Sequence, residues 1–132
     1  MKKFICLLIC AIIVMMNMCL FTAANNDSYT FEIDDVEYTV KINDPYVSAE
    51  KKQTIANAIV CQNNTDIMTV NVWCDIFGHD YKYTTASVMQ HKVNVYAPRC
   101  KEQLYDVTYC EDCDYTEQKL ISTSYINCCP ED

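Results

Sequence analysis

Glycine is almost absent from this chain, since Gly78 is the only one among 132 residues. A phosphate-binding loop and a hydrolase nucleophile elbow each need several glycines at fixed spacing, so neither motif is present. The His-Glu-x-x-His pattern of metalloproteases is also missing. Tight turns must depend on Asp and Asn instead. With no catalytic motif in the sequence, we expect a protein that is not an enzyme.

Basic residues are scarce as well. Ten Lys and Arg residues face 18 Asp and Glu residues, which gives a net charge of −8. No basic stripe exists, so nucleic acid and anionic lipid surfaces are poor partners. Ten tyrosines are present, most of them at expected strand positions. Because a tyrosine ring is apolar and carries a polar hydroxyl, these residues are suited to a binding surface, and we expect a protein or glycan partner of unknown identity.

The first 24 residues have the pattern of a secretory signal peptide. A short basic start, Met1–Lys3, precedes an apolar run over Phe4–Leu20, and small residues follow up to Ala24. This order is typical of a segment that is cleaved after a small residue. The apolar run is nearly long enough to span a bilayer, so an uncleaved membrane anchor is the alternative. We expect residues 1–24 to be removed and residues 25–132 to be secreted.

The first half of the secreted part predicts a hairpin followed by a helix. Apolar and polar residues alternate over Thr30–Ile33 and Val36–Ile42, with Asp34-Asp35 between them as a turn. Ser48 is a suitable N-cap for a helix that continues to about Cys61. The buried face of the hairpin should carry Phe31, Ile33, Val36, Tyr38, Val40 and Ile42.

The second half predicts strands with cysteines at their ends. Residues 67–73 favour a strand leading into Cys74, and residues 81–96 favour one long strand or two short ones. Residues 103–109 and 115–126 should form a hairpin with Cys110-Glu111-Asp112-Cys113 at its tip.

Together these elements predict a single small α+β domain over residues 25–132. A hairpin and helix occupy residues 25–62, and a Cys-rich antiparallel β unit occupies residues 67–132. The chain is too short for two separate hydrophobic cores. A core of this size gains from disulfides or a metal.

Three of the ten cysteines lie in the signal segment, and seven remain. Cysteines in an exported protein are interpreted first as disulfides. An odd number leaves at least one that is unpaired, intermolecular or bound to metal. The seven are Cys61, Cys74, Cys100, Cys110, Cys113, Cys128 and Cys129.

A structural zinc site is the alternative to complete disulfide pairing. Zinc in such sites takes four thiolate or imidazole ligands at tetrahedral angles, usually as two close pairs. The preferred set is His79, Cys100, Cys110 and Cys113. A first rival set replaces Cys100 by Cys74, and a second replaces His79 by His91. Outside the preferred set, Cys74 would pair with Cys128 or Cys129, and Cys61 would be the unpaired thiol.

A thiol oxidoreductase is the least favoured interpretation of Cys110-x-x-Cys113. Reactive pairs of this spacing open a helix, whereas both flanks here favour strands. The residues between the two cysteines, Glu111 and Asp112, are acidic. Acidic neighbours are expected to raise thiol pKa values, which disfavours a reactive thiolate.

The Cys-rich half, residues 74 to 129, contains a set of short motifs that occur together. They are His79-Asp80-Tyr81, Pro98-Arg99-Cys100, Tyr109-Cys110-Glu111-Asp112-Cys113, Thr116–Ile121 and Cys128-Cys129. With these motifs the Cys-rich half resembles a small module found in exported proteins of Gram-positive gut bacteria. The resemblance implies a β module held together by metal or disulfides and implies no catalytic activity.

These observations favour a secreted or cell-surface binding module whose cysteines hold the fold. A secreted toxin-like or antimicrobial effector is the alternative function. The acidic charge argues against membrane attack, because peptides that act in this way are usually cationic.

Overall fold

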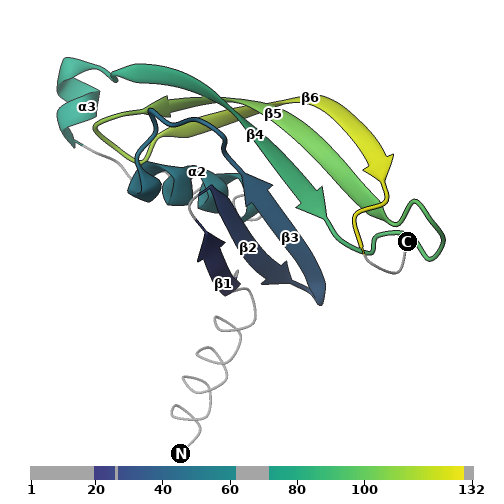
Figure 1. The fold of residues 1–132 in the computed structure, drawn as a ribbon. Coiled ribbons are helices and arrows are strands. Elements are labelled where there is room, and N and C mark those ends of the chain that lie inside the picture. The colour runs from purple at the N-terminus through teal and green to yellow at the C-terminus, as the bar shows by residue number, and fades with distance from the viewer. Residues whose placement is uncertain (1–19, 26, 62–71, 130–132) are drawn as a thin grey trace, which may run out of the picture.

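The computed structural model describes residues 20–25, 27–61 and 72–129. Each strand of the sheet pairs antiparallel with the next one in the sequence (Figure 1). The expected α+β class is therefore confirmed in outline. The hairpin and the Cys-rich strands, however, share one sheet, because β3 pairs with β4. The strands are β1 (Leu20–Asn25), β2 (Ser28–Ile33), β3 (Val36–Lys41), β4 (Tyr81–Gln90), β5 (Cys100–Cys110) and β6 (Thr116–Ile126).

The hairpin β2–β3 turns at the two residues expected from the sequence. Asp34 and Asp35 have φ values of 51° and 62°. Positive φ at both central residues is typical of the type I′ turn, whose twist matches that of the strands. The register places Phe31 opposite Tyr38 and Ile33 opposite Val36. The structure thus has a hairpin with the predicted turn at Asp34-Asp35.

Glycine should be the better residue at the second turn position. The Asp35→Gly variant is expected to be more stable by roughly 0.5–1 kcal/mol, because glycine adopts a positive φ without steric cost. Urea denaturation measures the change. Asp114→Gly is the matched control, since Asp114 is exposed in a turn but does not have a positive φ. A gain in the control and none at Asp35 would contradict this account of the turn.

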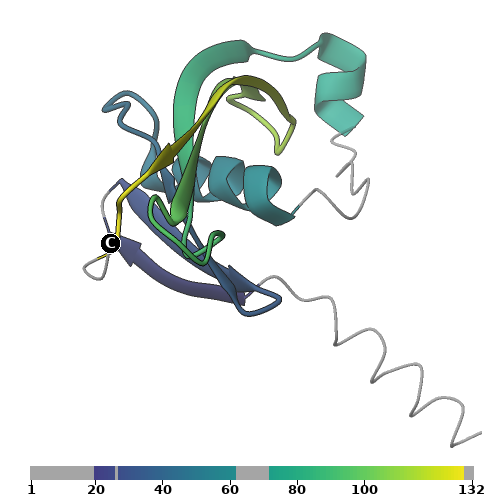
Figure 2. The same cartoon turned by 90° about the vertical axis from the view of Figure 1, so that its right-hand side faces the viewer.

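Helix α2 (Ala49–Cys61) covers the inner face of the curved sheet (Figure 2). The Ser48 side chain accepts a hydrogen bond of 3.2 Å from the backbone N–H of Lys51, which confirms the expected N-cap. The buried side chains of α2 include Ile55, Ala56, Ile59 and Val60. They share one hydrophobic core with strand residues that include Tyr29, Phe31, Val40, Ile42, Val88 and Val107.

One charged side chain is buried beside this core. Lys52 of α2 is 5% exposed and forms a salt bridge with Asp27, at the start of the hairpin. A buried ammonium group needs such a partner, because its desolvation is costly. The pair therefore ties α2 to the beginning of β2.

The region before β4 differs from the sequence prediction. Residues 62–71 lie outside the described residues, and Val72–Phe77 forms a short helix, α3, where the end of a strand was predicted. The β-forming stretch after it makes a single strand, β4, which ends at Gln90. The hairpin around Cys110 and Cys113 is confirmed as β5 and β6.

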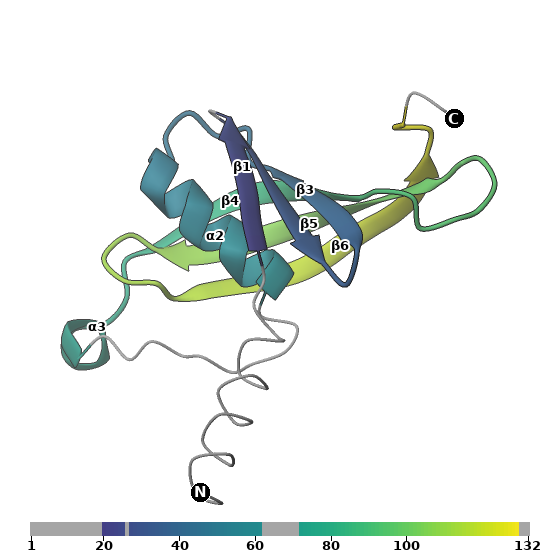
Figure 3. The ribbon, with the colours of Figure 1, turned by 90° about the horizontal axis from the view of Figure 1, so that it is seen from below.

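Strands β4, β5 and β6 are long, so the groups at their two ends lie far apart. Cys100 and Cys110 are the first and last residues of β5. Ten residue steps in an antiparallel strand span about 33 Å. Helix α3 lies near one end of these strands, and the end of β6 at Ile126 lies at the other (Figures 1 and 3). Cysteines at opposite ends of β5 therefore belong to different sites.

Most of the predicted signal segment lies outside the described residues. The cleavage position after Ala24 falls within β1, where Ala24 pairs with Tyr29 of β2. Among the described residues, none of the helices has the length and apolar character needed to cross a membrane. Export and cleavage remain predictions.

Candidate metal centre

Four Cys and His side chains converge near α3. Cys74 comes from α3, His79 follows that helix, Cys110 ends β5 and Cys113 lies in the turn before β6. Their ligand atoms all lie within 4.8 Å of one another. The Cys74 and Cys110 sulfurs are 3.8 Å apart, and the Cys113 sulfur is 3.3 Å from His79 Nδ1. Three thiols and one imidazole thus face a common point.

The three sulfurs are shielded from water. Cys74, Cys110 and Cys113 are 4%, 0% and 7% exposed. His79 is half-buried, and its ring contacts the Tyr81 and Tyr115 rings at centroid distances of 5.3 and 4.9 Å. The two tyrosines therefore restrict how the imidazole can turn.

The end of α3 places Cys74 and His79 on the same site. The backbone N–H of Gly78 donates to the Cys74 carbonyl at 2.8 Å, and Gly78 has a φ of +87°. This is the left-handed C-terminal position at which helices favour glycine. A Cβ added at Gly78 would meet no atom within 4 Å. The backbone conformation, and not the available space, explains why the chain's single glycine lies there.

Backbone hydrogen bonds fix the turn that carries Cys110 and Cys113. The Cys110 N–H donates to the Tyr115 carbonyl at 3.0 Å, and the Glu111 N–H donates to the Asp80 carbonyl at 3.0 Å. Lys51 of α2 donates from Nζ to the Cys113 carbonyl at 2.9 Å. The turn is thus joined to the His79 segment and to the core helix.

The thiols differ strongly in their affinity for protons. Burial raises the pKa of Cys110, but hydrogen bonds from the His79 side chain and from the backbone of Asp112 and Cys113 outweigh it, and the pKa is lowered to about 6. Burial, together with Cys113 and Cys110, raises the pKa of Cys74 to about 12. The Cys110 thiol therefore ionises more readily than the Cys74 thiol, and a bound cation would favour the thiolate form of both.

For Cys110, the lowered pKa corrects the expectation that acidic neighbours raise it. Glu111 and Asp112 are exposed to solvent, which screens their charges, whereas His79 and the backbone amides are close to the sulfur. A lowered thiol pKa favours reactivity, but the Cys110 side chain is completely buried. A substrate disulfide could not reach it without opening the site.

The ligand set fits zinc in chemistry and in size. Tetrahedral zinc with Zn–S bonds of about 2.3 Å places two sulfurs about 3.8 Å apart. The separation between Cys74 and Cys110 matches this value. Four protein ligands leave no position for a substrate or water, so such a site is structural and not catalytic.

A second cluster lies at the opposite end of the long strands. It contains His91, Cys100, Cys128 and Cys129, whose ligand atoms also lie within 4.8 Å of one another. Cys100 and Cys128 form a disulfide. Cys129 keeps its thiol, with its sulfur 3.3 Å from that of Cys100.

The structure brings together three residues of the preferred ligand set, His79, Cys110 and Cys113. Cys100 lies at the other end of β5, so it cannot share their ion. Cys74 takes the fourth position, as in the first rival set. His91 belongs to the second cluster and does not replace His79.

The disulfide predictions need correction in the same way. Cys74 does not pair with Cys128 or Cys129, because it keeps its thiol and belongs to the first cluster, whereas Cys128 and Cys129 belong to the second. The partner of Cys128 is Cys100. Cys61 ends α2 and is itself in a disulfide, so the expectation of an unpaired thiol there is also corrected.

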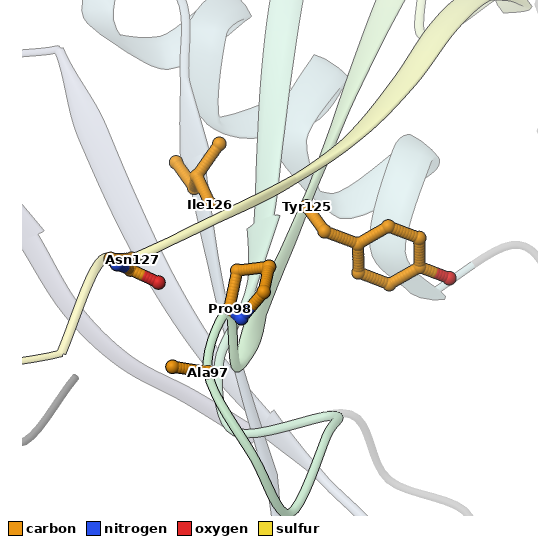
Figure 4. A pocket seen from close by; sticks show the side chains of 5 residues that line it. All are labelled: Ala97, Pro98, Tyr125, Ile126 and Asn127. Atoms are coloured by element: carbon orange, nitrogen blue, oxygen red, sulfur yellow. The ribbon is translucent and has the colours of Figure 1, made fainter.

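A shallow pocket near the second cluster offers little for ligand recognition. The side chains of Ala97, Pro98, Ile126 and Asn127 border it, and the Tyr125 ring points away from the other four (Figure 4). None of these residues carries a charge. The pocket therefore adds no chemistry to the two Cys and His clusters.

No protein-family model, curated protein or solved structure matches the chain. The resemblance to exported bacterial modules therefore stays a prediction.

Proposed function

We propose that this protein is an exported, non-enzymatic binding module in which a structural zinc ion holds α3 in place. The observation that carries the proposal is the unusual exposure of α3. Among residues 73–77, whose side chains the structure describes, Cys74 alone is buried. Trp73, Ile76 and Phe77 are 71%, 66% and 75% exposed.

A helix as short as α3 cannot hold itself in place. It has six residues, and isolated helices shorter than about 12 residues are marginal in water. Burial of its apolar side chains does not supply the missing stability, because these side chains face solvent. The sulfur of Cys74 is its buried anchor, and binding of that sulfur to zinc would fix the helix.

The exposed side chains of α3 form a surface suited to a partner. The Trp73 and Phe77 rings are stacked with their centroids 5.5 Å apart, and Ile76 lies between them in the sequence. Exposed apolar groups of this kind mark interaction sites, and aromatic side chains dominate the energetics of such interfaces. We name Trp73, Ile76 and Phe77 the α3 patch, and we propose an apolar protein surface as its partner.

Export is part of the proposal and is supported by the N-terminal pattern of a signal peptide. Burial of the thiols is consistent with it, because oxidation competes for exposed thiolates outside the cell. A bound zinc ion would protect the same three sulfurs further.

The metal is tested by the mass of the intact purified protein. Under native conditions the protein should carry one zinc ion, which is lost on denaturation in acid. Alkylation after denaturation should then label Cys74, Cys110 and Cys113, in addition to the Cys129 thiol of the second cluster. A protein with no metal and with these three cysteines resistant to alkylation would contradict the proposal.

The α3 patch is tested by partner capture. The wild-type protein and a Trp73→Ala/Phe77→Ala variant are immobilised, and proteins retained from the surroundings of the producing cells are compared. Tyr46→Ala is the matched control, since Tyr46 is 94% exposed and lies outside α3. A partner lost by the double variant and kept by the control supports the patch. Equal capture by all three proteins would overturn it.

Gly78 should influence the zinc affinity through the end of α3. The Gly78→Ala variant is expected to bind zinc about fivefold more weakly, because a left-handed conformation costs alanine roughly 1 kcal/mol. Competition with a chelator of known affinity measures the change. Gly78→Asn is the control, since asparagine tolerates this conformation better. An unchanged affinity in the alanine variant would show that the end of α3 does not restrain the ligands.

A further inference from the structure

We propose that His91, Cys100, Cys128 and Cys129 form a second zinc site, which becomes available when the Cys100–Cys128 disulfide is reduced. The inference goes beyond the proposed function, because it concerns a different cluster at the other end of the sheet. It makes this end of the protein a metal site controlled by the oxidation state of two cysteines.

The imidazole of His91 is directed at all three sulfurs. Its Nδ1 atom lies 3.3 Å from the Cys128 sulfur, 3.9 Å from the Cys129 sulfur and 4.0 Å from the Cys100 sulfur. An ion placed among the sulfurs would therefore have a nitrogen ligand in position. The ligand set, three thiols and one imidazole, is the same as at the first cluster.

The Nε2 atom of His91, on the side of the ring away from the sulfurs, has polar partners, as is typical of a metal-binding histidine. Its Nε2 atom lies 3.0 Å from the Thr39 hydroxyl and 3.7 Å from a Glu37 carboxylate oxygen. The backbone N–H of His91 also donates to the Glu37 carbonyl at 2.9 Å. A proton on Nε2 directed at Thr39 and Glu37 leaves the Nδ1 lone pair facing the sulfurs. Metal-ligating histidines characteristically have such an outer partner.

The position of Cys129 favours a shared ion over disulfide exchange. Its sulfur is 3.3 Å from the Cys100 sulfur and 3.7 Å from the Cys128 sulfur. In-line attack on a disulfide would place the attacking sulfur about 2 Å farther from one of the two than from the other. Cys129 instead lies beside the bond, nearly equidistant from both sulfurs. Three sulfurs grouped in this way resemble one face of a tetrahedral site.

The surroundings of the cluster would attract and admit a cation. A cavity of about 520 Å³ is lined by Cys128, Cys129 and His91 together with Glu32, Asp35 and Glu37. Lys92 is the one basic side chain in its lining. The three carboxylates outweigh that charge and favour a divalent ion. His91, Cys128 and Cys129 are only half-buried, so an ion can reach them.

Formation of the site begins with the two-electron reduction of the Cys100–Cys128 disulfide. A dithiol reductant becomes a disulfide, and its two electrons and two protons convert the Cys100–Cys128 bond into two thiols. Zn²⁺ then displaces the three thiol protons of Cys100, Cys128 and Cys129 into solvent. His91 binds as a neutral imidazole through Nδ1. Thiol–disulfide exchange with a small-molecule disulfide, which is reduced to two thiols, reforms the Cys100–Cys128 bond and releases the ion.

The experiment uses a Cys74→Ser/Cys113→Ser protein, in which the first cluster cannot hold metal. This background separates the present inference from the proposed function. The protein is reduced with a phosphine, the reductant is removed without oxygen, and zinc is added. We expect one zinc ion per reduced chain and none per oxidised chain. Co²⁺ in place of zinc should give the absorption of tetrahedral thiolate coordination only after reduction.

Two further substitutions in that background assign the ligands. His91→Ala and Cys129→Ser are each expected to weaken zinc binding by at least about 100-fold. Lys92→Ala is the control and should bind zinc as well as the parent. Circular dichroism establishes that each variant is folded. A reduced parent that takes up no metal, or one whose metal binding survives both ligand substitutions, would overturn the proposal.

Discussion

Replacing Cys113 by serine is expected to abolish the proposed binding of zinc and to loosen α3. Removal of one thiolate from a four-ligand site should weaken zinc binding by more than about 100-fold. A ligand present at a thousand times its dissociation constant stabilises the folded state by about 4 kcal/mol, and this contribution is lost with the ion. Bound zinc per chain and the urea midpoint measure both effects.

Tryptophan fluorescence can measure the expected loosening of α3. Trp73 is the only tryptophan of the chain and lies beside Cys74 in α3. Its fluorescence anisotropy should fall in the Cys113→Ser protein, because the helix gains motion when its anchor is released. Cys129→Ser is the matched control in the oxidised protein, because the Cys100–Cys128 disulfide keeps the second cluster, to which Cys129 belongs, from binding zinc. Equal loss of zinc in both variants would contradict the assignment of Cys113.

Replacing Phe31 by alanine is expected to cost about 3–5 kcal/mol of unfolding free energy. Phe31 is completely buried where β2 faces α2, and its neighbours in the core are fixed by both the sheet and the helix. The cavity can therefore collapse only in part, which places the cost high. Urea denaturation measures it, with Leu120→Ala as control, because Leu120 is 47% exposed on an edge strand. A cost below about 1 kcal/mol would show that the core does not depend on this strand.

The elements that could be predicted are those with a strong local pattern. The β2–β3 hairpin followed from strict alternation on both sides of Asp34-Asp35, and the start of α2 followed from Ser48. The β5–β6 hairpin was evident from its β-forming residues. Periodicity and capping are properties of a few neighbouring residues, so a single sequence reveals them.

The fourth residue of the candidate metal site was mispredicted because the strand that carries Cys100 is longer than expected. The expected strand began at residue 103, which left Cys100 in a loop that could fold back toward Cys110. The observed β5 begins at Cys100 and holds the two cysteines about 33 Å apart. Helix α3 was missed because its β-forming residues favour a strand and only Cys74 anchors it. Which cysteines meet depends on strand ends, the least predictable feature of a sequence.

The order of the metal-site residues along the chain affects how the protein should respond to a protease. The exposed loop between β4 and β5 includes Val95 and Tyr96, which are 78% and 84% exposed. A single cut there would fall between Cys74 and His79 on one side and Cys110 and Cys113 on the other. The paired strands β4 and β5 and a shared ion would keep the two fragments together. The two fragments of the cleaved protein would therefore stay associated until the metal is removed and the sheet is unfolded.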